Sequence, residues 1–176
     1  MADIYDITLV RVDNRLVHGQ ILEAWVPFLK AQCIIVVNDN VAGDFYCETV
    51  IRMAIPSEIE VIVSTVEEFA KNYTFTRDGG KKTIVLFSTV ADAVRAYNLG
   101  FHFDKLNIGN VYNEKYKLCH VPSVFLCDKE IKDILKLLEK NKVAIEIKTI
   151  PLERSVNIKD VIKDYCVKKR PKKAGI

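Results

Sequence analysis

The apolar residues of this chain gather in short runs that are separated by longer amphipathic stretches. The runs are rich in valine and isoleucine and alternate little with polar residues, a pattern typical of parallel strands covered on both faces. The sequence therefore predicts seven strands, at residues 6–10, 33–37, 60–63, 83–87, 105–108, 123–126 and 144–148.

The amphipathic stretches between these runs predict helices. Thr65 and Glu68 have the spacing of a capping box at a helix start. Asp128 can cap a helix with an apolar stripe, Gly100 can end one, and Pro27 is expected to end or kink the first one. The predicted helices lie at residues 21–26, 65–73, 90–97 and 128–138.

Strands and helices thus alternate along the whole chain, which indicates an α/β fold with right-handed crossovers. We expect an open, mainly parallel twisted sheet of about seven strands with helices on both faces. No repeat or low-complexity linker divides the 176 residues, so residues 1–166 are predicted to form a single domain. Residues 167–176 are basic and are predicted to be a disordered C-terminal tail.

Charge and cysteine content narrow the classes of function. A formal net charge of +3 is too small to indicate nucleic-acid binding. The five cysteines are odd in number and include no Cys-x-x-Cys pair, which favours a reducing compartment over a disulfide framework or a zinc site. The apolar runs fall far short of the ~20 residues that span a bilayer, and the first residues lack a signal-peptide pattern. We therefore expect a cytoplasmic protein that associates with the membrane only peripherally, through partner subunits.

The segment of residues 11–20 is the strongest candidate for chemistry. It lies between the first predicted strand and the first predicted helix, and it places His18 beside Gly19, after two arginines and an aspartate. Ligands of open α/β sheets bind beyond the carboxyl ends of the strands, and free N–H groups at a helix start favour anions. The segment therefore predicts a phosphoryl site, although the same residues would also suit a solvated loop.

Each residue type in the segment suits phosphoryl transfer. An imidazole is substantially neutral near pH 7 and can act as a nucleophile. The planar forks of Arg11 and Arg15 match phosphoryl oxygens, and Asp13 can orient an arginine or fix the tautomer of His18. Gly19 would let the backbone approach a phosphate closely.

Residues 11–20, Arg-Val-Asp-Asn-Arg-Leu-Val-His-Gly-Gln followed by Trp25, closely resemble the active-site signature of enzyme IIB of the mannose/fructose/sorbose family of the bacterial sugar phosphotransferase system. Residues 34–39 resemble its second strand and the turn after it, and Leu106-Asn107-Ile108-Gly109 resembles a later element. The C-terminal pattern matches from Ser123 to Pro151. The resemblance covers residues 5–165.

The resemblance implies that the protein is a phosphotransferase whose His18 accepts a phosphoryl group from a phosphohistidine of a IIA protein. His18 would pass that group to a sugar bound by a membrane IIC/IID partner. Arg15 would contact the phosphoryl group, with Asp13 and Arg11 as supporting residues. No cofactor or metal is implied. The other expected contacts of the phosphoryl group are Asn14, Gly19, Gln20 and Lys117, with Arg11 from the supporting pair.

The loop at residues 109–117 departs from the family pattern. Asn110 replaces a glycine and Tyr116 stands in place of a second one, while Lys117 keeps the basic position. This departure leaves open a regulatory phosphoprotein whose phosphorylation state is read by another protein. A histidine phosphatase is disfavoured, because that class needs Arg-His-Gly where this chain has Val17-His18-Gly19, and a second essential histidine, for which His120 is a poor candidate.

Overall fold

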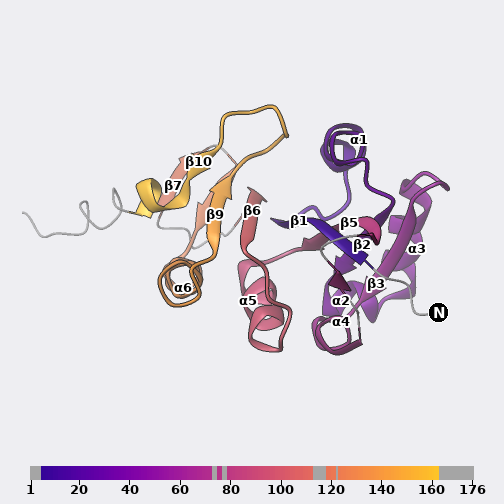
Figure 1. The fold of residues 1–176 in the computed structure, drawn as a ribbon, viewed down its shortest axis with the longest axis horizontal. Coiled ribbons are helices and arrows are strands. Elements are labelled where there is room, and N and C mark those ends of the chain that lie inside the picture. Colours follow the sequence, from indigo (N-terminus) through magenta and orange to yellow (C-terminus); the bar gives the residue numbers. More distant parts are fainter. Residues whose placement is uncertain (1–4, 73–74, 77–78, 113–117, 122, 163–176) are drawn as a thin grey trace, which may run out of the picture.

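A central sheet organises the computed structural model, which describes residues 5–72, 75, 76, 79–112, 118–121 and 123–162. Its strands run parallel except for one antiparallel strand at an edge (Figure 1). Across the sheet the order is β10 (Val156–Asn157), β9 (Ala144–Ile147), β6 (Lys105–Asn110), β1 (Tyr5–Asp13), β5 (Lys81–Phe87), β2 (Cys33–Val37) and β3 (Glu60–Ser64). The short β4 (Phe75–Thr76) pairs with the start of β1. The predicted open, mainly parallel sheet is confirmed.

The predicted strand at residues 123–126 is not a full strand of this sheet. It forms β8 (Val124–Leu126), which pairs with β7 (Leu118–Val121) in an antiparallel hairpin and meets the chain after β6 only through an isolated parallel bridge between Val124 and Val111. A short apolar run shows that a segment is buried but not which strand it pairs with, and here the nearest segment in the chain is the partner. Leu126 is still fully buried, because the hairpin packs into the same core as the sheet.

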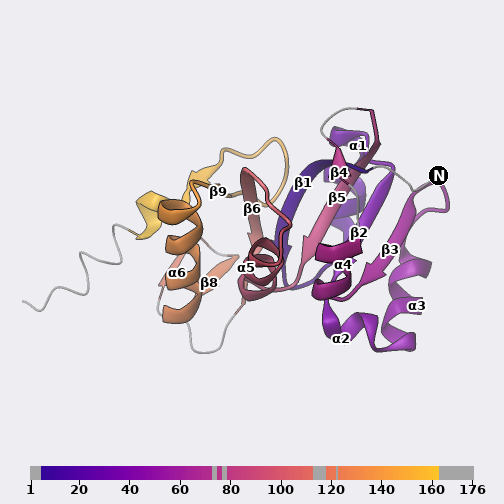
Figure 2. The ribbon, with the colours of Figure 1, turned by 60° about the horizontal axis from the view of Figure 1, so that its bottom comes forward.

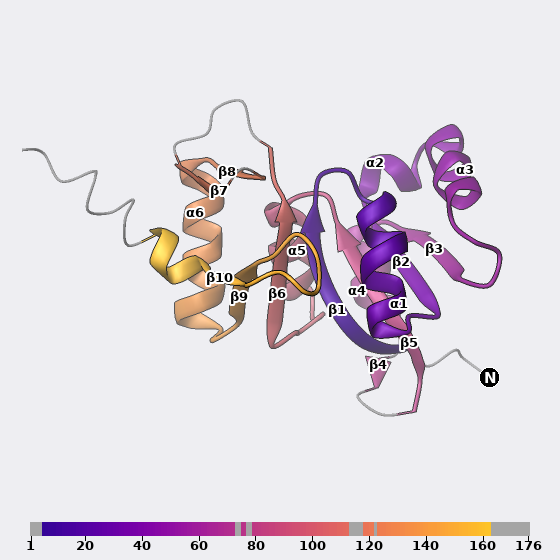
Figure 3. The same ribbon diagram turned by 90° about the horizontal axis from the view of Figure 1, so that it is seen from above.

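Helices cover both faces of the sheet, as predicted (Figures 2 and 3). The core on one face joins β1, β2, β5, β6 and β9 to the helices that follow β3, β5 and β8. The core on the other face is smaller and lies under the helices that follow β1 and β2. The first group is α4 (Val66–Asn72), α5 (Val90–Asn98), α6 (Asp128–Leu135) and η2 (Lys136–Lys140), and the second is η1 (Gln20–Trp25), α1 (Val26–Leu29), α2 (Asp39–Ala42) and α3 (Phe45–Ala54).

Helix ends follow the predicted local chemistry at two places and depart from it at two others. The backbone N–H of Glu68 donates to Oγ1 of Thr65 at 3.2 Å, as the capping box requires, and Gly100 follows α5 with φ of 113°. The cap of α6 is Cys127, so Asp128 is the first residue inside that helix. Pro27 does not end the first helical segment, which continues from η1 into α1. It lies in the first turn of α1, directly after the π-helix gives way to an α-helix, and there its missing N–H is tolerated.

The two faces differ at β6 and β9. On the α1 side no helix of the described residues covers these strands. Residues 148–155, which connect β9 to β10 and are called the strap below, pass over β6 beside α1 (Figure 3). The strap is tied to the first helix by the indole N–H of Trp25, which donates to the carbonyl of Thr149 at 3.0 Å. The strap therefore covers the face of the sheet beside the end of β1. No helix of the described ranges is long and apolar enough to cross a membrane.

Candidate functional site

The candidate site begins where β1 leaves the sheet. β1 continues past its predicted end at Val10 to Asp13, and a tight turn follows in which the N–H of Leu16 donates to the carbonyl of Asp13 at 2.9 Å. Leu16 has φ of 54°, a left-handed conformation that costs a non-glycine residue roughly 1–2 kcal/mol. Its side chain is buried in the core beneath α1, and this burial offsets the cost and holds the loop in place.

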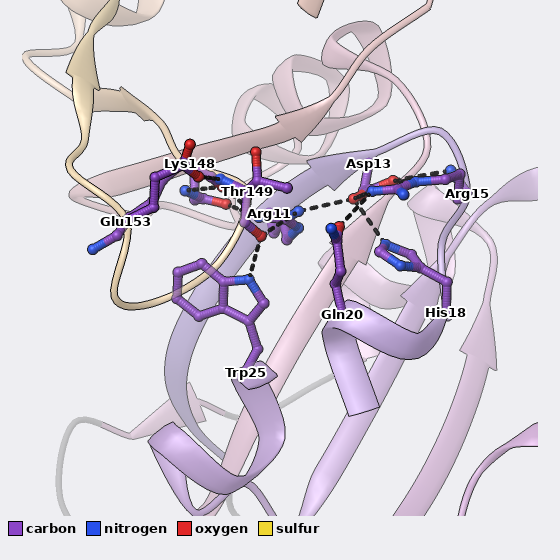
Figure 4. A network of polar contacts seen from close by, with 10 residues as sticks. Arg11, Asp13, Arg15, His18, Gln20, Trp25, Lys148, Thr149 and Glu153 are labelled. Carbon is purple, nitrogen blue, oxygen red and sulfur yellow. Dashed lines mark hydrogen bonds and ion pairs between the residues drawn. The ribbon is translucent and has the colours of Figure 1, made fainter. Parts of the chain in front are cut away.

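His18 lies at the end of this loop, immediately before η1. Its carbonyl accepts the backbone N–H groups of Ile21 and Leu22 at 2.9 and 3.1 Å, so the helix start fixes the main chain of the histidine. The ring turns towards β1, and Nε2 lies 3.0 Å from Oδ2 of Asp13 (Figure 4). The side chain is 16% exposed. Among the described residues no hydrogen bond reaches Nδ1.

Asp13 is the centre of the site. Its side chain has no exposed surface, and its carboxylate accepts hydrogen bonds from Arg11, Arg15 and His18. Burial by itself would raise the pKa of Asp13, but the hydrogen bonds from His18 and Arg15 and the charge of Arg11 hold that pKa well below its usual range. Asp13 is therefore an ionised carboxylate throughout the physiological pH range.

Arg15 binds Asp13 from the solvent side. Its backbone N–H and Nε both donate to Oδ1 of Asp13 at 3.1 Å, and Nη2 donates to Oδ2 at 3.1 Å. Nη2 also donates to the side-chain carbonyl of Gln20 at 3.0 Å. The side chain is 43% exposed, and within the described part of the chain Nη1 makes no hydrogen bond. Arg15 is therefore oriented by the protein and still has a donor that faces outwards.

Arg11 binds the same carboxylate from inside the protein. It has no exposed surface, and Nη2 donates to Oδ2 of Asp13 at 2.9 Å. Its other partners are the side-chain carbonyl of Asn107 and the strap carbonyls of Lys148 and Thr149. Burial lowers the pKa of Arg11, and the negative charge of Asp13 opposes that shift. Arg11, predicted among the contacts of the phosphoryl group, thus lies beneath the site and not on its surface.

Asn14 joins the histidine loop to the neighbouring strand ends. Its side-chain NH₂ donates to the carbonyl of Ser88 at 2.7 Å, and its side-chain oxygen accepts the backbone N–H of Tyr112. Its own backbone N–H donates to the carbonyl of Asn110 at 2.9 Å. These contacts hold the loop over the ends of β5 and β6, while a phosphoryl contact of Asn14 stays a prediction.

The remaining predicted residues lie beside the histidine or outside the described ranges. Gly19 has φ of –50°, which any residue can adopt, and a Cβ there would meet nothing within 4 Å. Gln20 holds the Arg15 guanidinium. Lys117 and Tyr116 lie outside the described residues. The described residues hold no group of three or more metal-ligating side chains.

Sequence reasoning missed how much of the site is buried. It predicted the loop and its polar residues, but neither the burial of Arg11 beneath the loop nor the strap that Trp25 holds in place. The signal for that burial was the Asn107-Ile108-Gly109 element, which the resemblance identified without assigning it a role. The site thus combines a partly buried imidazole and a more exposed guanidinium, both bound to a buried, ionised carboxylate.

The chain is similar to known proteins over nearly its whole length. A sequence model of the family described as "PTS system sorbose subfamily IIB component" matches residues 7–173. The sorbose-specific EIIB component of Klebsiella pneumoniae is 30% identical over 162 residues, which cover 91% of this chain and 98% of that protein. The fructose-specific EIIB component of Bacillus subtilis (strain 168) is 29% identical over 159 residues, which cover 90% of this chain and 97% of that protein.

A solved structure shows the same architecture. The crystal structure of manxB from Thermoanaerobacter tengcongensis superposes with a TM-score of 0.82 and 27% identity, and the match covers 93% of this chain and 99% of that one. Sequence and fold therefore agree over nearly the whole chain, and they give the protein a phosphotransfer role in sugar uptake. The chain belongs to the sorbose-subfamily IIB components of the sugar phosphotransferase system.

Proposed function

We propose that this protein is a cytoplasmic phosphocarrier whose His18 accepts a phosphoryl group from a phosphohistidine of a IIA-type protein. It passes the group to a sugar bound by a membrane IIC/IID partner. One observation carries the proposal: Nε2 of His18 is held 3.0 Å from the buried carboxylate of Asp13. Because a carboxylate at Nε2 keeps the proton on that nitrogen, the lone pair lies on Nδ1.

Nδ1 is accordingly the nucleophile. Its lone pair forms a bond to phosphorus as the nitrogen–phosphorus bond of the donor breaks, and the bonding electrons return to the donor imidazole. The His18 ring gains positive charge as the new bond forms, and the Asp13 carboxylate at Nε2 stabilises that charge. Delivery to the sugar reverses the roles: a sugar hydroxyl attacks phosphorus, the nitrogen–phosphorus bond breaks with its electron pair returning to Nδ1, and the hydroxyl proton leaves to a base of the membrane partner or to water.

Arg15 binds the transferred group. Phosphoryl transfer spreads negative charge over three equatorial oxygens, and catalysis depends on positioned groups that stabilise it. Asp13 and Gln20 hold the guanidinium through Nε and Nη2, which leaves Nη1 for a phosphoryl oxygen. The open space beside Gly19 lets the same oxygens approach the backbone at the start of η1.

A labelling experiment tests the proposal. The protein is incubated with phosphoenolpyruvate, enzyme I, the carrier HPr and a cognate IIA protein, and its mass is measured before and after acid treatment. We expect an acid-labile adduct of about 80 Da, one phosphoryl group, that is absent from His18→Ala. An adduct that persists in this variant would exclude His18.

Two further measurements sharpen the result. ¹⁵N NMR of the phosphorylated ring should place phosphorus on Nδ1, and phosphorus on Nε2 would contradict the role given to Asp13. Membranes that contain the IIC/IID partner and a sugar should then discharge the phosphoprotein and yield sugar phosphate. Phosphorylation without discharge would favour the regulatory alternative.

A further inference from the structure

The element Asn107-Ile108-Gly109 has no part in the function proposed so far. It lies in β6, the strand that pairs with the carboxyl end of β1. In the parallel register Asn107 is opposite Arg11. The element therefore runs directly beside the strand that carries the site.

Asn107 grips the buried guanidinium. The residue is fully buried, and its side-chain oxygen accepts a hydrogen bond from Nη1 of Arg11. Its NH₂ group donates to the carbonyl of Lys148 at 3.3 Å. That same carbonyl accepts from Nη1 at 2.8 Å, so Asn107 aligns both the guanidinium and the strap above it.

Gly109 makes room for the same group. A Cβ built at this position would lie 1.7 Å from Nη2 and 1.9 Å from Cζ of Arg11. The clash is with a side chain that hydrogen bonds hold at both ends, so the guanidinium has no free direction in which to yield. The glycine is therefore explained by the guanidinium that lies over it.

The strap encloses the Arg11 guanidinium on the side opposite β6. The carbonyl of Thr149 accepts from Nη2 of Arg11 at 3.3 Å and also from Trp25. The indole ring lies 5.5 Å from the guanidinium carbon, a cation–π distance (Figure 4). Arg11 is thus enclosed by β6, the strap and the first helix, and it extends towards Asp13.

From these contacts we propose that Asn107 and Gly109 are positioning residues for His18. They fix the Arg11 guanidinium against Oδ2 of Asp13, the oxygen that also faces Nε2 of the imidazole. A carboxylate held from behind cannot rotate away, so it keeps the ring proton on Nε2 and leaves Nδ1 free. The inference deepens the proposed function and rests on it for the reaction, whereas the ring tautomer can be measured without any phosphoryl donor.

Among the described residues, few charged groups surround Arg11 and Asp13. Asp13 contacts Arg11, Arg15 and His18, and Glu153 of the strap adds a negative charge near Arg11. Arg15 binds Asp13 from outside and would remain if the guanidinium of Arg11 moved. Displacing Arg11 should therefore leave the Asp13 carboxylate ionised but less firmly oriented. The preference of the His18 ring for the Nε2–H tautomer should then weaken, while the charge of Asp13 stays the same.

The test compares two glycines. ¹⁵N NMR of His18 in the native protein should show the Nε2–H tautomer, and Gly109→Ala should mix the two tautomers. Phosphorylation by phosphoramidate, in which Nδ1 gains phosphorus and ammonia leaves, should slow at least about tenfold, as for a misplaced catalytic group. The control is Gly43→Ala, where a Cβ would meet only ordinary contacts from 3.4 Å outwards.

A second pair guards against a variant that fails to fold. Asn107→Leu removes the acceptor at similar volume and should give the same mixed tautomers, whereas Ile108→Val, which faces the opposite core, should not. Unchanged tautomers in a folded variant of either positioning residue would overturn the proposal. So would a native spectrum with the proton on Nδ1. If no donor phosphorylates the native protein while the tautomers respond as expected, the proposed function fails and the positioning inference stands.

Discussion

Arg11 and Arg15 bind the same carboxylate from opposite sides. Arg11 has no exposed surface and is enclosed by β6, the strap and the first helix. Arg15 is 43% exposed and has only Asp13 and Gln20 as side-chain partners among the described residues. The two side chains have the same chemistry, so the difference between them comes from their surroundings.

The difference in burial gives the two arginines different roles: Arg11 supports the structure of the site, and Arg15 is available for the reaction. A buried charge is costly unless it is paired and hydrogen-bonded. Nη1 and Nη2 of Arg11 have four acceptors, whereas its buried Nε has no hydrogen-bond partner among the described residues. An exposed guanidinium costs little to place and can exchange water for a phosphoryl oxygen. Asp13 links the two, because it needs Arg11 to stay oriented and Arg15 to offset its charge at the surface.

The largest expected effect is on stability, in Arg11→Leu. The substitution leaves Asp13 buried with one arginine fewer and leaves each of the two strap carbonyls with one donor fewer. We expect a loss of about 3 kcal/mol or more in the free energy of unfolding, as when one partner of a buried ion pair is removed. Urea denaturation of both proteins measures this loss.

Arg15→Leu is the matched control for that experiment. Because Arg15 is partly exposed, its loss should change the free energy of unfolding by less than about 1 kcal/mol. Equal losses at the two positions would show that burial does not distinguish the two arginines.

The next effect is on the rate of transfer. Arg15→Lys keeps the charge but loses the planar fork, so phosphorylation of His18 should slow by about 30-fold, or roughly 2 kcal/mol. Quench-flow measurement with the phosphorylated donor protein gives the rate. Arg52→Lys is the control, since Arg52 is 47% exposed and also pairs with a carboxylate. A slowing of the same size in both variants would point to general surface charge.

Much of the fold was readable because local signals and packing agree. The valine-rich runs became buried strands, and the Thr65 and Glu68 capping box opens α4 as predicted. Helix α3 was not predicted: most of its apolar side chains face outwards, with Tyr46 and Met53 about four-fifths exposed, while Ile51 packs against the core. The β7–β8 hairpin was missed because the pattern of one strand does not specify its partner, and here the partner is the neighbouring segment of the chain.

The site likewise has a part that the sequence could predict and a part that it could not. The sequence indicated His18 and Arg15, because their position after the first strand and their chemistry both suggest an anion site. It could not show that Arg11 faces inwards, because strand alternation places a residue on a face without saying what covers that face. The cover is the strap, and its contact with Trp25 joins positions 124 residues apart in the chain.

Lowering the pH should protonate Asp13, the carboxylate that both arginines bind, and so weaken both ion pairs. The pKa of Asp13 is lowered in the folded protein: burial opposes the shift, but the bonds from His18 and Arg15 and the charge of Arg11 outweigh it. A carboxyl of this kind contributes stability that is complete above its unfolded pKa of about 3.9 and is lost as the pH falls below that value.

Comparison with Asp13→Asn isolates this contribution. Between pH ~5 and ~3 the free energy of unfolding of the native protein should fall more steeply than that of the variant, by up to about 1.4 kcal/mol per pH unit for one proton. Urea denaturation at a series of pH values provides both slopes. Parallel slopes would mean that Asp13 does not stabilise the fold through its charge.

The smallest expected effect is that of salt, and it should act on the exposed arginine alone. Raising the salt from ~50 to ~500 mM shortens the screening length well below 10 Å, which should slow phosphorylation by the donor protein several-fold. The salt dependence should weaken in Arg15→Gln and persist in Arg52→Gln, since only Arg15 lies at the histidine. The free energy of unfolding should hardly respond, because the ion pair of Arg11 with Asp13 is fully buried and poorly screened. A transfer rate indifferent to salt, or one equally sensitive in both variants, would remove Arg15 from the encounter with the donor.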